Sequence, residues 1–160
     1  MINTAITTPP TGRLQLALNV EDLAASTRFY ADLFGSEPIK QRDEYVNFAI
    51  AEPPLKLILF QGPHGGTINH LGVEVPSSAE VQQTINRLEG TEMRLDVEQN
   101  VTCCYATQDK VWVTAPDGER WEYYTVLADA EQAAPEGDDC GCSTADTSES
   151  ATGACCASVA

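Results

Sequence analysis

The chain has 160 residues, with 24 acidic and 9 basic side chains and a formal net charge of -15. This length suits one domain or two small fused modules, and the charge argues against nucleic acid or an anionic membrane as a partner. No apolar run approaches the roughly 18 residues of a membrane span and no signal peptide is evident, so we expect a cytoplasmic protein with reduced cysteines.

The two ends of the chain differ in composition from the part between them. Residues 1–12 read as a flexible arm, and residues 129–160 form an acidic tail without Lys or Arg. Such a composition is typical of a disordered segment. Residues 13–128 are therefore the expected folded domain. The tail also carries four thiols in patterns that suit soft metals, namely Cys140, Cys142, Cys155 and Cys156.

The expected domain contains an internal repeat. Residues 14–35 align without a gap with residues 69–90, which places Gln15 on His70 and Gly35 on Gly90. Each segment begins with strand-like alternation and continues into an amphipathic helix. Each glycine is expected to end its helix in the left-handed conformation. The expected apolar helix faces are Leu23, Tyr30, Leu33 and Phe34 in the first copy, and Val81, Ile85 and Leu88 in the second, where Ser77 and Glu80 form a capping-box pattern.

Further strands are expected after each helix. They lie near residues 44–50 and 55–60 in the first copy, and near 94–98, 110–115 and 120–126 in the second. The prediction is an α+β fold of two repeated βαβββ modules, about 13–62 and 67–128. Their curved mixed sheets would enclose a metal-binding cleft, and a disordered C-terminal tail would follow.

Alternation along three strands directs Gln15, His70 and Glu122 toward one concave surface. Two nitrogen or oxygen ligands with a carboxylate and open positions are typical of non-haem Fe(II) sites. The alternative is structural, because a single strand histidine is more often a hydrogen-bonded residue and Gln or Glu at strand ends is usually solvated. Small residues at Ala17 and Gly72 would leave room on this surface.

Cys103 and Cys104 are adjacent, and on a regular strand their side chains would point to opposite faces. We therefore expect them in a loop or irregular segment. Thiolates suit soft centres, whereas the alternative is a pair of buried cysteines that pack as small apolar groups. Tyr105, Asp109 and Lys110 follow as possible cleft residues.

Four segments carry a more specific pattern: LQLALNVEDLAASTRFYADLFG, YVNFAIAEPPLKLIL, NHLGVEV and TCCYATQDKVWVTAPDGERWEYY. They resemble the carbon–arsenic lyases and the related cadmium-induced proteins, a family of the vicinal oxygen chelate superfamily that also includes glyoxalases and extradiol dioxygenases. The resemblance covers residues 13–126. It implies an enzyme that uses Fe(II) and molecular oxygen to cleave the carbon–arsenic bond of trivalent organoarsenicals, converting methylarsenite to arsenite and formaldehyde, with aromatic arsenicals also accepted.

The resemblance also implies roles for individual residues. The metal ligands would be Gln15, His70 and Glu122, and the substrate thiols would be Cys103 and Cys104. Gln15 stands where much of the superfamily has histidine. A fourth superfamily ligand would fall at Leu57 or Leu59, so three protein ligands are expected.

Two other functions stay open at this point. One is a thiol-based protein that binds cadmium or arsenite without turnover, which the tail cysteines favour. The other is a glyoxalase or an extradiol dioxygenase, neither of which needs adjacent thiols. We expect a monomer or a homodimer that binds small molecules.

Overall fold

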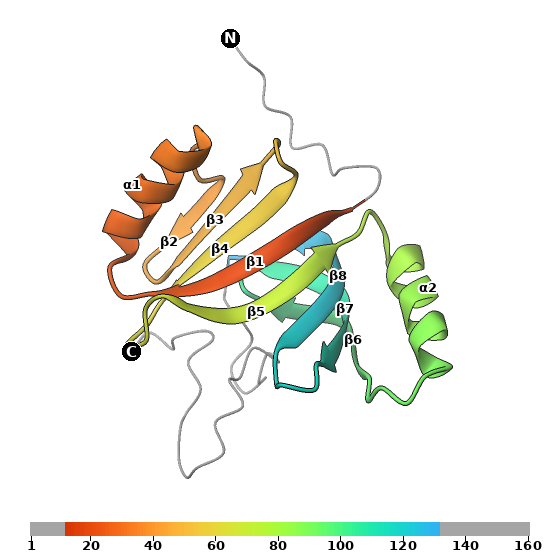
Figure 1. The fold of residues 1–160 in the computed structure, drawn as a ribbon. Helices are drawn as coiled ribbons and strands as arrows, with labels where there is room; N and C mark the ends of the chain where they lie inside the picture. The colour runs from red at the N-terminus through yellow and green to blue at the C-terminus, as the bar shows by residue number, and fades with distance from the viewer. Residues whose placement is uncertain (1–11, 132–160) are drawn as a thin grey trace.

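The computed structural model describes residues 12–131. The predicted arm at residues 1–11 and the tail from residue 132, with its four cysteines, lie outside the described residues. The elements are β1 Arg13–Val20, α1 Leu23–Phe34, β2 Lys40–Arg42, β3 Tyr45–Ile50, β4 Leu55–Gln61, β5 Thr67–Glu74, α2 Ser78–Glu89, β6 Asp96–Cys103, β7 Ala106–Thr114 and β8 Arg120–Asp129 (Figure 1). This order confirms the two βαβββ modules.

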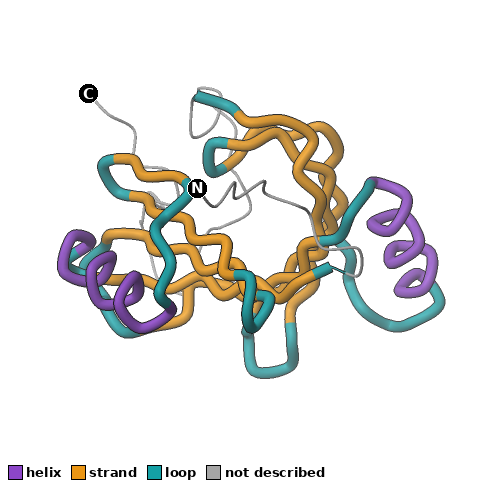
Figure 2. The backbone as a smooth tube through the Cα atoms, turned by 90° about the horizontal axis from the view of Figure 1, so that it is seen from above, coloured by secondary structure: helices purple, strands orange, loops and turns teal. Residues whose placement is uncertain are grey.

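The described strands form one eight-stranded sheet in the order β2-β3-β4-β1-β5-β8-β7-β6. The central strands β1 and β5 are antiparallel, and each is parallel to the last strand of its own module. Figure 2 shows the sheet curled into a half-barrel with both helices on its outer side. The curled sheet confirms the predicted α+β fold, and its inner face is the surface on which a site can form. No helix within residues 12–131 has the length and apolar character needed to cross a membrane.

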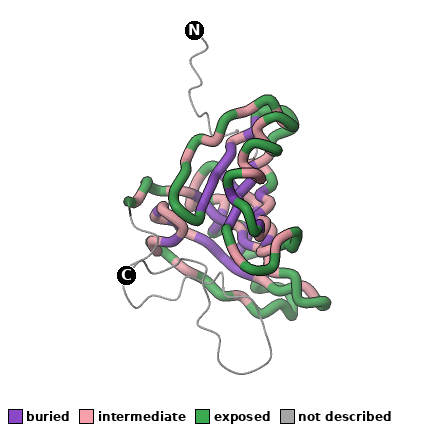
Figure 3. Tube along the Cα trace, turned by 90° about the vertical axis from the view of Figure 1, so that its left-hand side faces the viewer, coloured by how far each residue is buried: buried purple, intermediate pink, exposed green. Residues whose placement is uncertain are grey.

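Each helix covers an apolar cluster on the outer side of the sheet. The α1 cluster contains Val20, Leu23, Val46, Phe48, Ile50, Leu57 and Leu59, and the α2 cluster contains Val75, Val81, Ile85 and Val111. A third cluster, which we call the inner apolar wall, consists of Ala17, Tyr45, Ile58 and Phe60. In Figure 3 the buried segments, drawn in purple, lie along the strands of the sheet. Tyr30 and Phe34 pack as predicted, but Leu33 is 58% exposed, so its assignment to the apolar face was wrong.

The ends of the helices match the sequence signals only in part. Asp22 caps α1 by accepting from the backbone N–H of Ala25 at 2.8 Å, and Gly35 ends it in the left-handed region with φ 58°. Gly90 has φ -78°, so the predicted left-handed end of α2 is wrong. The Ser77 hydroxyl donates to the Glu80 carboxylate and accepts no hydrogen bond from a backbone N–H of the first turn, so the capping box does not form.

The strands around the cysteines are longer than predicted. The segment expected to be irregular is mostly ladder, because β6 runs to Cys103 and β7 starts at Ala106. Only Cys104 and Tyr105 lie between them. The position of strand β2, with only Lys40 to Arg42, was not among the expected strand segments, because three polar residues show no alternation of buried and exposed positions.

Candidate metal and thiol site

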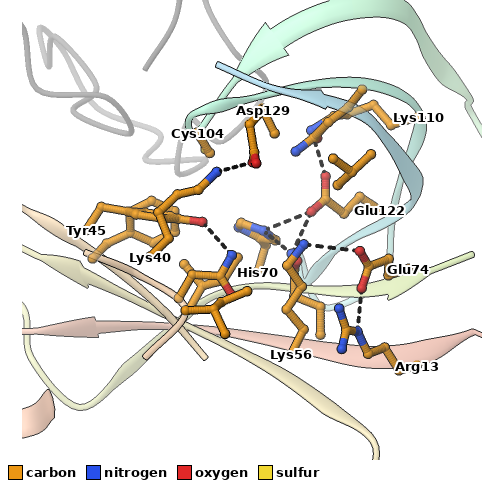
Figure 4. A pocket seen from close by; sticks show the side chains of 18 residues that line it. Arg13, Lys40, Tyr45, Lys56, His70, Glu74, Cys104, Lys110, Glu122 and Asp129 are labelled. Carbon is orange, nitrogen blue, oxygen red and sulfur yellow. Dashed lines mark hydrogen bonds and ion pairs between the residues drawn. The ribbon is translucent and has the colours of Figure 1, made fainter. Parts of the chain in front are cut away.

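Gln15, His70 and Glu122 converge on the inner face of the sheet from β1, β5 and β8. They are 3%, 3% and 4% exposed. Figure 4 labels His70 and Glu122 in this arrangement. The Gln15 Nε2 lies 3.0 Å from His70 Nε2 and donates to Glu122 Oε1 at 2.6 Å, and His70 Nε2 lies 3.3 Å from the same oxygen. The structure thus brings together the three residues that the sequence analysis proposed as ligands, which we call the polar trio.

Strand register explains why these side chains meet. Gly72 on β5 lies opposite Gln15 on β1 and beside Glu122 on β8. A Cβ at Gly72 would lie 3.0 Å from Cγ of Glu122 and 3.3 Å from Cβ of Gln15. The space that two members of the trio occupy therefore depends on a residue without a side chain.

The two modules are related by the repeat, which identifies the fourth ligand position. In the first module Ala17 on β1 pairs with Ile58 on β4, just as Gly72 pairs with Glu122 in the second. Ile58 is therefore the counterpart of Glu122. The expectation of Leu57 or Leu59 is wrong, because both are fully buried beneath α1 on the other face. The conclusion that no carboxylate is present there still holds.

The trio fits a first-row divalent metal. His70 Nδ1 lies 2.7 Å from Asn69 Oδ1, an arrangement in which Nδ1 carries the proton and Nε2 presents its lone pair to the trio. Gln15 Oε1 accepts from the Tyr124 hydroxyl, and its amide N–H group faces His70 and Glu122. Rotation of the Gln15 amide by half a turn would direct its oxygen toward His70 and Glu122. Its NH₂ group would then face the Tyr124 hydroxyl, which can accept a hydrogen bond as well as donate one. Imidazole nitrogen with amide and carboxylate oxygens is a donor set that such metals accept.

The Gln15 amide is needed to complete any metal site here. Within residues 12–131, no group of three His, Cys, Asp or Glu side chains is arranged to hold a metal ion. A metal at the trio would therefore have only two strong protein ligands and one neutral amide.

Lys110 sets the charge of the trio. Its Nζ donates to Glu122 Oε2 at 2.9 Å, and both side chains are buried. Burial opposes ionisation of Glu122, but the positive charge of Lys110 outweighs it and holds the pKa of Glu122 well below 4.5. The carboxylate is therefore charged at neutral pH. Lys110, proposed only as a possible cleft residue, is a direct partner of the trio.

The two cysteines lie at the tip of the β6–β7 hairpin. Cys104 and Tyr105 have φ 53° and 64°, which is typical of a two-residue type I′ turn, and Cys103 pairs with Ala106 across it. The sulfur atoms are 3.2 Å apart, well beyond the roughly 2.05 Å of a disulfide bond. Both residues are therefore thiols. The turn lets adjacent side chains approach each other, which a regular strand does not allow.

The cysteine turn contacts both modules. The Lys40 ammonium group of β2 donates to the Tyr105 carbonyl at 2.9 Å and to the Asp129 carboxylate at 2.6 Å. The N–H of Ala130 donates to the same carbonyl at 2.9 Å. The Tyr105 ring lies 5.3 Å from the Tyr45 ring on β3. Contacts from both ends of the sheet therefore hold the turn.

A cavity of about 210 Å³ joins Cys104 to the trio. Its lining includes Cys104, the trio and Lys110, with residues that the sequence analysis did not select: Arg13, Ile39, Lys40, Tyr45, Asn47, Lys56, Ile58, Phe60, Ala106, Gln108, Val126 and Asp129. Most of these could have been found by extending the same alternation to β3, β4 and β7.

Asp109 does not line this cavity. It accepts from the Ser78 hydroxyl at 2.5 Å and from the Asn100 backbone N–H at 2.7 Å, next to α2. The expectation that Asp109 is a cleft residue is therefore wrong for this cavity. Cys103 and Tyr105 are also outside the lining, although the Cys103 sulfur contacts that of Cys104.

A buried ion cluster lies beside the trio. Glu74 pairs with Arg13 at 2.5 Å and with Lys56 at 3.3 Å. Burial opposes ionisation of Glu74, but Lys56 and Arg13 outweigh it and lower its pKa. Burial also lowers the pKa of Lys56. The Glu74 carboxylate is therefore engaged by two cations.

The chain belongs to the Glyoxalase/Bleomycin resistance protein/Dioxygenase superfamily, whose family model matches residues 12–123. The fold agrees with solved members. A Mn(II)-bound glyoxalase from Novosphingobium aromaticivorans has a TM-score of 0.57 at 20% identity, with 76% of this chain and 40% of that chain covered. Homoprotocatechuate 2,3-dioxygenase from Arthrobacter globiformis gives 0.56 at 21% identity, with 82% and 42% covered. This chain thus spans about two-fifths of each, and the likeness concerns the fold alone.

Relatives with higher identity carry two different names. The chain is 60% identical over 120 residues to the cadmium-induced protein CadI of Mycobacterium tuberculosis strain H37Rv. This alignment covers 74% of this chain and 79% of CadI. It is also 50% identical over 150 residues to a trivalent organoarsenical cleaving enzyme of Thermomonospora curvata. That alignment covers 90% of this chain and 99% of the enzyme.

Proposed function

We propose that this protein is an enzyme that cleaves the carbon–arsenic bond of trivalent organoarsenicals with Fe(II) and molecular oxygen. The observation that carries the proposal is the pair of thiols, with sulfur atoms 3.2 Å apart, at the edge of a cavity that also contains the polar trio. The 50% identity to a trivalent organoarsenical cleaving enzyme supports it.

The thiols suit trivalent arsenic because both are soft. Methylarsenite has one carbon bond and two exchangeable positions. Cys103 and Cys104 would fill both positions and leave the carbon free to enter the cavity. Holding the arsenical beside the trio makes the reaction effectively intramolecular. Cys104 lines the cavity directly, and Cys103 supports it from the end of β6.

Gln15, His70 and Glu122 would hold Fe(II), which supplies the redox chemistry with oxygen that Zn²⁺ lacks. Lys110 keeps Glu122 ionised, and Asn69 orients the His70 ring. The stoichiometry closes without another reactant, since methylarsenite and O₂ together contain the atoms of arsenite and formaldehyde. A reductant is needed only to keep the iron ferrous.

The second candidate is a protein that binds cadmium or arsenite without turnover. The 60% identity to a cadmium-induced protein favours it, as do the tail cysteines outside the described residues. A thiol pair binds soft metals whether or not iron is present. The two functions therefore differ in whether arsenite and formaldehyde are released.

The test uses the purified full chain with Fe(II), a reductant, methylarsenite and air. We expect release of arsenite with matching consumption of oxygen. Zinc-loaded protein, oxygen-free mixtures and the variants His70→Ala and Glu122→Ala should release none. Gln15→Ala is expected to retain some metal, because an amide is the weakest of the three ligands. Binding of methylarsenite without release, in fully iron-loaded protein, would contradict the enzyme and favour sequestration.

A further inference from the structure

Hydrogen bonds lead from His70 away from the trio toward the loop before β5. His70 Nδ1 lies 2.7 Å from Asn69 Oδ1, and Asn69 Nδ2 donates to Asn19 Oδ1 at 2.9 Å. Asn19 Nδ2 donates to the Thr67 hydroxyl at 2.9 Å, and that hydroxyl donates to the backbone carbonyl of His64 at 2.7 Å. We call these four hydrogen bonds the asparagine network. Neither Asn19 nor Thr67 has a role in the function proposed above.

A β-bulge places Asn69 against His70. Between β1 and β5, Ala17 pairs with His70 and Leu18 pairs with Ile68, so β5 has one extra residue, Asn69, between these two pairs. On a regular strand, adjacent side chains point to opposite faces, whereas a bulge changes the direction of a side chain. The bulge therefore explains how Asn69 reaches the ring of the residue next to it.

The backbone carbonyl at the far end of the network fixes the direction of every bond in it. A carbonyl only accepts, so the hydroxyl proton of Thr67 is used there and the hydroxyl oxygen accepts from Asn19. The NH₂ group of Asn19 therefore faces Thr67, and its oxygen accepts from Asn69. By the same step, the Asn69 oxygen faces His70, which must donate from Nδ1. The proton of the neutral ring is therefore on Nδ1.

The other side of the ring gives the same tautomer independently. Glu122 is a charged carboxylate that only accepts, so the end of the Gln15 amide that meets it at 2.6 Å is the NH₂ group. The same nitrogen lies 3.0 Å from His70 Nε2. Because an NH₂ group only donates, Nε2 must offer a lone pair. Hydrogen bonds on both ring nitrogens therefore agree.

We infer that Asn19 and Asn69 are positioning residues of the metal site, which hold His70 in the tautomer that presents Nε2 to a metal ion. This inference rests on the proposed function and names two further residues for its site. A partner on the second nitrogen of a metal-binding histidine typically contributes about 10–100-fold to metal affinity. Asn19 acts only through Asn69, so its contribution should be smaller. Both asparagines are half-buried, whereas Thr67 is exposed and water can replace its bonds.

The first test observes the tautomer in metal-free protein. The chain has two histidines, so the ¹⁵N spectrum of a full-length His64→Gln protein shows the ring of His70 alone. This change spares the network, because His64 contributes only its backbone carbonyl. At mildly alkaline pH we expect a protonated Nδ1 and an unprotonated Nε2. Asn69→Leu and Asn19→Leu should mix the tautomers and move the two nitrogen shifts toward each other. Asn19→Asp should keep one tautomer, because a carboxylate still accepts from Asn69.

The second test measures Fe(II) affinity without turnover, by anaerobic titration against a chromophoric chelator. Asn69→Leu should weaken binding about tenfold or more. Asn19→Leu should weaken it by a smaller factor, and Asn19→Asp should keep the wild-type affinity. Asn86→Leu, on the exposed face of α2, is the matched control for the loss of an asparagine.

Three results would overturn the inference. One is a protonated Nε2 in the metal-free protein that retains both asparagines. Another is an Asn19→Leu protein whose His70 shifts and iron affinity match those of Asn19→Asp. The third is wild-type iron affinity in a folded Asn69→Leu protein. If Asn69→Leu does not fold, the comparison of the two Asn19 variants decides. The expected tautomer and its loss in Asn19→Leu, without iron binding in any protein, would uphold the positioning of His70 and contradict the proposed iron enzyme.

Discussion

Replacing Gly72 with alanine tests whether the polar trio is a metal site. The new Cβ would lie 3.0 Å from Cγ of Glu122, and 3.3 Å from both Cβ and Nε2 of Gln15. Carbon atoms pack at about 3.5–4.0 Å, so Glu122 must move by roughly 0.5 Å. Overpacking of this kind costs about 1–3 kcal/mol of stability. The substitution therefore shifts two members of the trio without changing either.

A shift of this size exceeds what a metal site tolerates. Ligand distances in such sites hold to about 0.2 Å, so we expect Fe(II) affinity to fall at least about tenfold. Anaerobic titration of Fe(II) against a chromophoric chelator measures the affinity, and thermal unfolding reports the stability. Gly62→Ala is the matched control, because a Cβ at Gly62 has no neighbour within 4 Å. A folded Gly72→Ala protein with wild-type iron affinity would refute the assignment of the trio.

Three further predictions concern the thiols, the buried ions and the end of the domain. Changing Cys103 and Cys104 to serine should abolish methylarsenite binding in equilibrium dialysis and leave Fe(II) binding intact; normal turnover in the double variant would contradict the thiol role. Glu74→Gln should lower the free energy of unfolding in urea by about 3 kcal/mol or more, because it leaves buried cations unpaired. Since the pKa of Glu74 is lowered from 4.5, its contribution is present above pH 4.5 and is lost as the pH falls through the folded-state pKa. A difference between wild type and Glu74→Gln that persists in acid would be inconsistent with this. A chain ended at Ala128 should melt at a lower temperature than one ended at Glu131, because the residues between them bond to β2 and to the cysteine turn; equal melting temperatures would argue against it.

The parts of the site that the sequence predicted depend on periodicity alone. Period-two alternation and the gapless repeat were enough to direct Gln15 and His70 to one face of adjacent modules. The same alternation placed the Glu122 side chain on the opposite face of β8 from the residues on either side of it. Their convergence depended on the order of strands in the sheet, in which β5 lies between β1 and β8. That order was not predicted from the sequence, since periodicity does not specify which strands pair.

The missed features depend on pairing and burial, which a sequence pattern does not specify. The type I′ turn at Cys104 and Tyr105 lacks the Asn-Gly signal that usually marks such turns. The error at Leu57 and Leu59 was a register shift of one residue, which moves a side chain to the opposite face. Oδ1 of Asn47 and Oε1 of Gln108 have no hydrogen-bond partner within the described residues, and only the contacts of the folded chain reveal this.

Ile58 and Glu122 occupy equivalent positions in the two modules, and this equivalence has an evolutionary consequence. A repeated module is what duplication of a shorter gene produces, and at this backbone position one copy holds a hydrocarbon and the other a carboxylate. The first copy supplies most of the apolar wall through β3 and β4, while the second supplies the thiols, the carboxylate and its lysine partner. Mutations on β3 and β4 can therefore reshape the wall with little effect on the reacting groups. New substrate preferences would be acquired there first.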